Sequence, residues 1–483
     1  MTAQLQGAQN QFNVVMFLPD QQRADTLASY GNPKVHAPNL NKLATESVVF
    51  ERAYVTQPVC SPSRASLMTG LWPHMTGCTN NGFTLDPRLA TLPELIGDRY
   101  RAGYVGKWHL RDEPPTKRGF RDWVSVEGVS DYSKFLKRKG LVPDHEKGGF
   151  SALTVSNLPL ALSRPKFVEH HACEFIRRNR KRPFILVVAF VEPHSPYNGP
   201  FNDEHPISEI EVDPAPSLSP SDEHLPLRYR LLREWEIDEA TRDNSGVVRQ
   251  FRFGVTPDEY RRLKQKYLGL ITLVDQSVGA ILACLDQNGL ADRTIVAHTS
   301  DHGDLLGAHG LFGKGVMFEQ AVHVPFMIRL PGCRPQQVKR PVSHIGFIPT
   351  LIDLVGRPKA SQAVGQSLVP LMRGEKTEPE DVFIEWNPYK KREKRIKKGT
   401  TLAPQPLVEQ AINESTRTVI SPDGWKLSLR DNDLNELYNL NEDPFETRNV
   451  YYSGQHSQVI ARCGNKIRQW QESTSDTVNL SFD

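Results

Sequence analysis

Short apolar runs without polar alternation recur along most of the chain. Three of them span residues 12–18, 183–191 and 294–299. Runs of this length that lack alternation are typical of strands buried on both faces of a sheet. Residues 258–286 instead carry apolar side chains at three- and four-residue steps, and Asn288-Gly289 follows as a stop signal, which predicts a long helix. The pattern therefore favours an α/β protein with an open sheet.

Further elements follow from the same pattern. Helices are expected at residues 39–46, 92–99, 168–180 and 344–355, and extended segments at 48–55, 104–110 and 324–329. The composition becomes polar between residues 370 and 378, which predicts a boundary between a domain of residues 1–375 and a smaller one of residues 376–483. The second part shows strand patterns at 382–386, 417–420 and 424–429, and a last helix at 457–471.

Composition excludes several classes of protein. The 483 residues are 38% hydrophobic and 24% charged, as in ordinary globular proteins, and a net charge of +3 is too small to indicate nucleic-acid binding. Residues 1–11 lack the basic and apolar regions of a secretory signal, and no run is expected to reach the length of a membrane span. The six cysteines have no paired metal-type spacing. We expect a cytoplasmic protein with reduced thiols.

Polar residues follow four of the predicted strands. They are Asp20 and Gln21, Lys107 and His109, His194, and Asp301 and His302. The strand pattern of residues 104–110 predicts that Lys107 and His109 project from one face. Carboxyl ends of parallel strands lie at one edge of a sheet, so the whole set is expected to converge. Taken singly, two of them have a plainer interpretation: Asp20 as a turn residue or cap, and His194 as part of a proline-flanked strand end.

Three of these side chains offer hard oxygen ligands. Carboxylates of Asp20 and Asp301 with the amide of Gln21 suit Ca²⁺. A nitrogen from His302 makes the site more tolerant of Mn²⁺ or other transition ions.

Residues 59–70 resemble a nucleophile at the start of a helix. Ser61 is a good N-cap, Pro62 suits the first helical position, and Gly70 can end the helix. Cys60 would then lie at the positive end of the helix, one turn from Arg64, which favours a thiolate and an anion pocket. A buried structural cysteine is the plainer alternative.

Four segments together resemble the signatures of the sulfatase family. They are Cys-x-Pro-Ser-Arg at 60–64 with Thr69-Gly70, Gly-Lys-Trp-His at 106–109, Pro-His-x-Pro-Tyr at 193–197, and Leu-Tyr-Asn-Leu-x-x-Asp-Pro at 437–444. The resemblance implies an alkaline-phosphatase-like α/β fold: a large, mixed, mostly parallel sheet flanked by helices, with a smaller C-terminal α+β subdomain. It also implies that a maturation enzyme oxidises Cys60 to formylglycine, whose aldehyde hydrate is the nucleophile.

Two positions depart from the common family pattern. Gln21 stands where many members have a second aspartate, and His302 where many have asparagine. An Asp-Gln pair with an Asp-His pair is similar to the branch that contains choline sulfatases and phosphonate monoester hydrolases.

Cleavage of a sulfate ester assigns a role to each group. A hydroxyl of the hydrate at position 60 attacks sulfur, and Asp301 accepts its proton. His194, assisted by Lys314, protonates the leaving oxygen, while His109 holds the second hydroxyl. The metal and the cations Arg64, Lys107 and Lys314 neutralise the sulfuryl oxygens. Asn80 or Asn81 could present an amide to the oxyanion, although turn chemistry explains both equally well.

Several alternatives stay open. The same site would serve a phosphonate monoester hydrolase or phosphodiesterase, and an unmodified Cys60 would suit a non-catalytic binder of sulfated ligands. A thiol hydrolase with a Cys60–His109 pair leaves the metal-type cluster unexplained. The substrate is expected to be a small-molecule or saccharide sulfate ester, selected by residues 195–226 and the basic residues 389–398. No nucleic acid or membrane partner is expected, and a homo-oligomer is possible.

Overall fold

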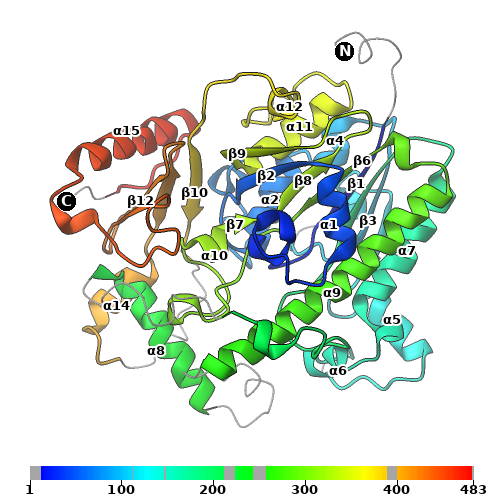
Figure 1. Ribbon diagram of the computed structural model, residues 1–483, viewed down its shortest axis with the longest axis horizontal. Coiled ribbons are helices and arrows are strands. Elements are labelled where there is room, and N and C mark those ends of the chain that lie inside the picture. Colours follow the sequence, from blue (N-terminus) through cyan, green and yellow to red (C-terminus); the bar gives the residue numbers. More distant parts are fainter. Residues whose placement is uncertain are drawn as a thin grey trace.

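A computed structural model describes residues 12–111, 114–145, 148–211, 224–242, 257–388 and 400–480. Among these residues the chain forms a nine-stranded sheet and a separate four-stranded sheet (Figure 1). The large sheet contains β1 (Asn13–Phe17), β2 (Val48–Tyr54), β3 (Arg101–Gly106), β4 (Asp122–Ser125), β5 (Phe184–Ala189), β6 (Thr294–Thr299), β7 (His323–Val324), β8 (Phe326–Arg329) and β9 (Gln336–Ser343). The small sheet contains β10 (Val382–Trp386), β11 (Thr416–Ile420), β12 (Trp425–Arg430) and β13 (Glu436–Asn439).

β1 lies in the middle of the large sheet. The strand order is β4-β3-β5-β1-β6-β8-β2-β7, and β9 lies beside β2. β1 is parallel to β5 and to β6, with Val14 opposite Ile185 on one side and Ile295 on the other. Because β8 is antiparallel to β6 and β2, the sheet is mixed and mostly parallel, as the sequence predicts.

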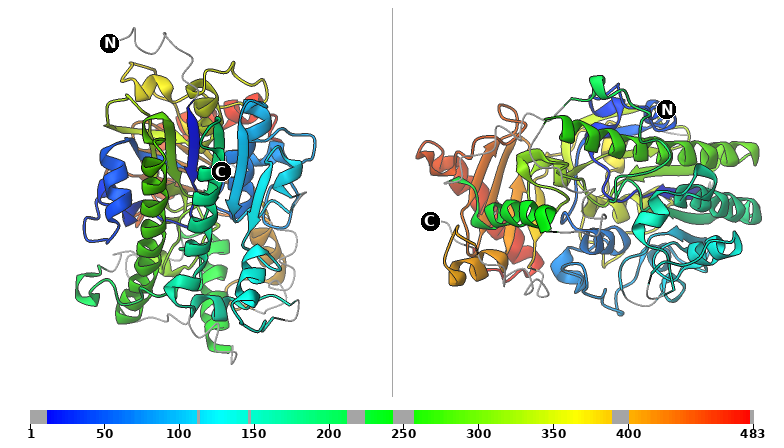
Figure 2. Two further views of the ribbon diagram at one scale, coloured as in Figure 1. Left: turned by 90° about the vertical axis from the view of Figure 1, so that its right-hand side faces the viewer. Right: turned by 90° about the horizontal axis from the view of Figure 1, so that it is seen from below.

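Helices cover both faces of this sheet (Figure 2). The described α-helices between residues 38 and 372, not all of which touch the sheet, are α1 (Pro38–Thr45), α2 (Cys60–Thr69), α3 (Pro73–Thr76), α4 (Leu92–Ile96), α5 (Asp131–Arg138), α6 (Ala152–Ser156), α7 (Arg164–Asn179), α8 (Leu227–Arg242), α9 (Pro257–Gln287), α10 (Glu319–Val322), α11 (Phe347–Leu354) and α12 (Val369–Met372). Val15 and Phe17 pack in one core with α1, α7 and α9. Val14 and Met16 face the other way and pack with α2, α4 and α11. Alternate side chains of one strand therefore enter two cores, which explains its unbroken apolar sequence.

α9 is the longest described helix. It has a mean hydropathy of 1.8 over 18 residues, so by length and composition it could cross a membrane, contrary to the expectation that no run is long enough. However, 72% of that stretch is buried inside the molecule, against α7 and the sheet. This is the pattern of a core helix in a large α/β protein.

The C-terminal residues form a smaller unit (Figure 1). The antiparallel sheet β10–β13 packs against α15 (Ser457–Thr474) through Leu427, Leu429 and Ile467, and α14 (Gln405–Ile412) packs on α8. Its strands β10, β11 and β12 confirm the three predicted segments to within one residue, and β13 is a further strand that the sequence pattern does not predict. The boundary between residues 375 and 376 stays a prediction.

The end of β3 differs from the predicted strand of residues 104–110. The strand stops at Gly106, which has φ of 119°, and a Cβ there would lie 1.8 Å from the Ala189 carbonyl oxygen. Lys107 and His109 therefore follow the strand and do not share one of its faces. The predicted helix of residues 92–99 is also shorter, because Gly97 at φ of 93° ends α4.

β9 escaped prediction because its sequence, Gln-Gln-Val-Lys-Arg-Pro-Val-Ser, is polar and contains a proline. Proline is tolerated at an edge position that lacks one ladder hydrogen bond. Within the described part of the chain β9 pairs only with β2, with a register shift near Arg52.

Candidate active site

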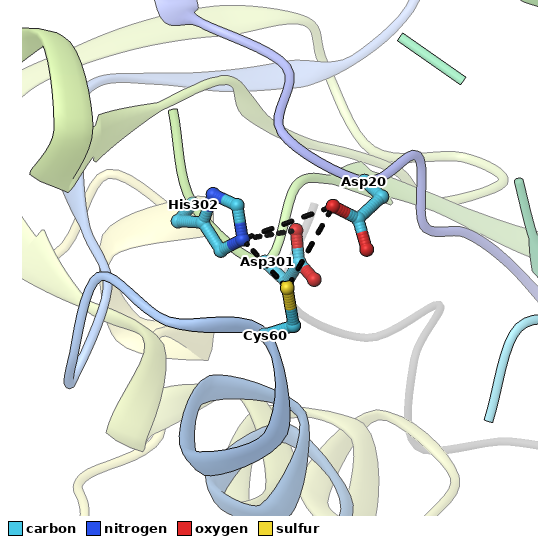
Figure 3. Close-up of side chains that lie close together, drawn as sticks. All are labelled: Asp20, Cys60, Asp301 and His302. Carbon is cyan, nitrogen blue, oxygen red and sulfur yellow. Dashed lines mark hydrogen bonds and ion pairs between the residues drawn. The ribbon is translucent and has the colours of Figure 1, made fainter. Parts of the chain in front are cut away.

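The carboxyl ends of four parallel strands place polar groups at one edge of the large sheet. Asp20 follows β1, Lys107 follows β3, His194 follows β5, and Asp301 with His302 follows β6. Cys60 enters from α2, which packs on the same end of the sheet (Figure 3). The structure thus brings together the groups that the sequence predicts to converge.

Four of these side chains form a compact set of metal-ligand atoms. Asp20, Cys60, Asp301 and His302 are buried and each offers one atom within 4.8 Å of the others. Nε2 of His302 lies 3.1 Å from Sγ of Cys60 and 3.7 Å from one oxygen of each aspartate. Its Nδ1 lies 2.9 Å from the Gly303 carbonyl and donates to it, so Nε2 presents its lone pair to the cluster. This donor set fits a divalent cation.

Arg64 lies behind the cluster and joins its two carboxylates. Nε donates to Asp301 Oδ2 at 2.8 Å, and Nη2 donates to Asp20 Oδ2 at 3.1 Å. Nη1 donates to the Lys107 carbonyl at 2.9 Å. Because the Oδ2 atoms face the guanidinium, the Oδ1 atoms are left to face His302 and Cys60.

Positive charge dominates the electrostatics of the site. Nζ of Lys107 lies 2.7 Å from Asp20 Oδ2. Burial opposes ionisation of Asp20, but Lys107 and three further basic groups hold the pKa of this carboxyl well below its usual range. Burial raises the pKa of Asp301, although the Arg64 charge opposes this. The site is therefore arranged to hold anionic groups.

Cys60 is the first residue of α2, with Val59 in the N-cap position. The prediction that Ser61 caps the helix is wrong: its hydroxyl donates to the His109 carbonyl at 2.6 Å, while Asn81 Oδ1 accepts the Ser61 N–H at 3.0 Å. Burial and Asp20 disfavour a thiolate at Cys60, but the charges of Lys314 and Lys107 help to hold the pKa of this thiol well below its usual range. This is the electropositive environment of a reactive position and not of an inert core thiol.

Gln21 lies beside the cluster in the left-handed backbone region, with φ of 71°. Its N–H donates to Asp301 Oδ1 at 3.0 Å, and Lys314 Nζ donates to its side-chain oxygen at 2.6 Å. Its side-chain nitrogen contacts Tyr197 and Asp304, two buried residues to which the sequence alone assigns no role. Tyr197 belongs to the Pro-His-x-Pro-Tyr segment and Asp304 follows Asp301 by three residues, but neither spacing by itself indicates a contact with Gln21.

Two further histidines belong to the predicted site. Burial, with Lys314 nearby, lowers the pKa of His194 to about 3, and its Nδ1 lies 2.8 Å from the Ser195 carbonyl. His109 is half-buried with φ of 60°, and its Nδ1 has no hydrogen-bond partner among the described residues. His194 therefore lies among the charged groups of the site, and the interaction of the His109 ring with a bound group stays a prediction.

Asn80 and Asn81 both make hydrogen bonds within the protein. Asn80 Nδ2 donates to the Asn387 carbonyl at 2.7 Å, and Asn81 Oδ1 caps α2 as described above. Their contact with a substrate stays a prediction.

Part of segment 195–226 and all of the basic segment 389–398 lie outside the described residues. The six cysteines are free thiols, and the cytoplasmic location stays a prediction.

Comparisons with known proteins cover nearly the whole chain. The sulfatase family profile matches residues 12–357. A choline-sulfatase of Rhizobium meliloti is 28% identical over 91% of this chain and 82% of that protein, and an N-acetylglucosamine-6-O-sulfatase of Bacteroides thetaiotaomicron is 22% identical over 96% and 87%. A solved phosphonate monoester hydrolase from Silicibacter pomeroyi superposes with a TM-score of 0.76 at 22% identity, covering 96% of each chain.

Proposed function

Because the chain belongs to the sulfatase family, we propose that it hydrolyses a sulfate monoester with a formylglycine made from Cys60. The match to the family profile and the named relatives confirm the family and the enzyme class that the sequence predicts. The nucleophile, the metal and the substrate belong to the proposal.

One observation carries this proposal: the position of Cys60. Its Sγ lies at the positive end of α2, 3.1 Å from His302 Nε2 and within a buried set of metal-type ligands. Burying cations costs free energy, so they are not expected around a cysteine that only packs in the core. A nucleophile that attacks an anionic sulfuryl group does need them.

The residues present fit a divalent cation, with Ca²⁺ favoured and Mn²⁺ as the alternative. Asp20, Asp301 and His302 would hold it, with the oxygen of Gln21 and the modified side chain at position 60. When bound, the cation would supply positive charge to the sulfuryl oxygens, and the aldehyde hydrate would supply the attacking hydroxyl.

The chain's own residues carry the remaining steps. Lys107 and Lys314 contribute positive charge from two sides, and Arg64 holds both aspartates in place. Asp301 accepts the proton of the attacking hydroxyl, and His109 orients the second hydroxyl. His194 protonates the leaving oxygen. An anionic ester beside its ring would raise the depressed pKa of His194 toward the range of a general acid.

The proposed substrate is a small-molecule or saccharide sulfate ester, in keeping with the names of two relatives. A formylglycine-generating enzyme is the proposed maturation partner. A phosphonate monoester hydrolase is the second candidate, favoured by the Asp20-Gln21 and Asp301-His302 pairs, which resemble that branch.

Two measurements test the proposal. Conversion of Cys60 to formylglycine lowers the intact mass by about 18 Da, so protein from a host that modifies this motif should carry that loss at Cys60. A retained thiol would support the non-catalytic binder instead. For converted protein, kcat/KM should be higher for an aryl sulfate than for an aryl phosphonate monoester. The reverse preference would replace the first candidate by the second.

A further inference from the structure

We propose that Asp304 and Tyr197 are positioning residues that fix the orientation of the Gln21 side-chain amide. Their hydrogen bonds hold its NH2 group away from the metal centre and leave its oxygen facing inward. The inference rests on the metal centre of the proposed function, but not on the reaction or its substrate.

Asp304 is a fully buried carboxylate that accepts hydrogen bonds on both oxygens. Oδ1 accepts the backbone N–H groups of Leu306 at 3.0 Å and Gly313 at 3.1 Å. Oδ2 accepts from Nε2 of Gln21 and from the hydroxyl of Tyr197. All four of these partners are donors, so Asp304 acts only as an acceptor. It can therefore pair with the NH2 group of Gln21 but not with the side-chain oxygen.

Tyr197 closes a triangle with the same two residues. The Tyr197 hydroxyl donates its hydrogen bond to Asp304. Its oxygen can therefore only accept from Gln21, whose Nε2 lies 3.1 Å away. The Asp304 carboxylate and the Tyr197 oxygen therefore lie side by side as acceptors for the Gln21 NH2 group. A flipped amide would lose both hydrogen bonds and leave buried groups unpaired.

The rest of Gln21 is held just as firmly. On the inward side, Nζ of Lys314, which can only donate, lies 2.6 Å from Oε1. The backbone N–H of Gln21 donates to Asp301, and its carbonyl accepts from Tyr267 at 2.7 Å. These bonds stabilise the left-handed backbone of Gln21, which is unfavourable for a residue with a side chain.

A neutral amide at position 21 avoids repulsion with the negative charge of Asp304. A carboxylate at position 21 would face Asp304 across a hydrogen-bond distance, and two buried like charges repel strongly. A neutral amide avoids this, but unlike a carboxylate it has one wrong orientation. Asp304 and Tyr197 remove that orientation, and Asp304 also ties Gly313 beside Lys314 through the same carboxylate.

The test is binding of Ca²⁺ and of Mn²⁺ to metal-free protein by calorimetry. In Asp304→Asn the oxygen must stay on the Leu306 and Gly313 N–H groups, so the new NH2 group faces that of Gln21 and the amide flips. We expect about 10- to 100-fold weaker binding, and a smaller loss in Tyr197→Phe.

The matched controls are Asp275→Asn, another buried carboxylate with backbone and amide donors, and Tyr132→Phe, another buried hydroxyl. Both should bind the metals normally.

An exchange of the two groups gives the sharper test. Gln21→Glu alone should bind metal poorly, whereas Gln21→Glu combined with Asp304→Asn restores a carboxylate–amide pair with its ends reversed and should recover most of the affinity. Wild-type affinity in both Asp304→Asn and Tyr197→Phe, or a double variant no better than Gln21→Glu, would overturn the proposal. If Asp304→Asn does not fold, Tyr197→Phe and the double variant decide. The two proposals can fail separately. If the wild-type protein had no sulfatase activity but Asp304→Asn and Tyr197→Phe still lowered its metal affinity, this inference would be supported and the proposed function would fail.

Discussion

Arg64 donates from Nε to Oδ2 of Asp301 at 2.8 Å, and both side chains are buried. The same guanidinium reaches Asp20 through Nη2. One arginine therefore compensates two carboxylates that would otherwise repel each other, and it leaves Oδ1 of each to face the side chains of Cys60 and His302. The preorganisation of the site depends on this residue as much as on the ligands.

Replacing Arg64 by Gln should destabilise the protein by about 3–5 kcal/mol, because buried Asp301 loses its arginine partner and buried Asp20 is left with Lys107 alone. Added Ca²⁺ should recover part of this loss by neutralising the same carboxylates. Urea denaturation with and without Ca²⁺ measures both effects. Arg88→Gln, which removes an exposed pair with Asp86, is the control and should leave stability unchanged. Equal stability of the two variants would refute the bridging role.

Cys60→Ala should abolish turnover while the fold survives, since alanine cannot be converted to an aldehyde and the substitution removes only one atom from the core. Hydrolysis of an aryl sulfate and circular dichroism check the two halves of this expectation. Cys463→Ala, which removes another buried thiol, should retain full activity. Residual turnover by Cys60→Ala at the wild-type rate would exclude position 60 as the nucleophile.

Asp301→Asn should lower metal affinity and activity together. Asp301 supplies an oxygen to the ligand cluster while its other oxygen accepts from Arg64. Asparagine has one acceptor oxygen, so it cannot serve both. Metal content by elemental analysis and the rate of aryl sulfate hydrolysis should fall in parallel, and normal values of both would refute Asp301 as a ligand.

The stability of the C-terminal unit should depend on pH through Asp433. This carboxyl accepts from the N–H groups of Leu227 and Arg228, and burial, with Glu414 nearby, raises its pKa from 3.8 to about 6. A raised pKa means that the folded state holds the proton more tightly, so this contribution to stability is present below pH 3.8 and lost as pH rises to about 6.

Asp433→Asn has no such titration. Relative to wild type, its free energy of unfolding should rise by about 3 kcal/mol between pH 4 and pH 7, the value of a shift of this size. Urea denaturation of both proteins across that range measures the difference. A constant difference would show that Asp433 does not titrate abnormally in the folded protein.

The sequence alone determined the central strands and the groups that follow them. β1, β5 and β6 are unbroken apolar runs because they are buried on both faces, and this signal is local. The same locality explains the family signatures around Cys60. The local pattern does not predict β9, because its place in the sheet comes from its partner β2 and not from its own polar sequence.

The assembly of the site depends on contacts between residues that are far apart in the chain. Ser61 has the properties of a cap, yet Asn81, twenty residues away, caps α2 while Ser61 bonds to His109. The chain leaves β3 at Gly106, where the positive φ and the close approach of the Ala189 carbonyl both require glycine. Hydrogen bonds between residues far apart in the chain choose one among several locally acceptable arrangements, and they become visible only when the chain is folded.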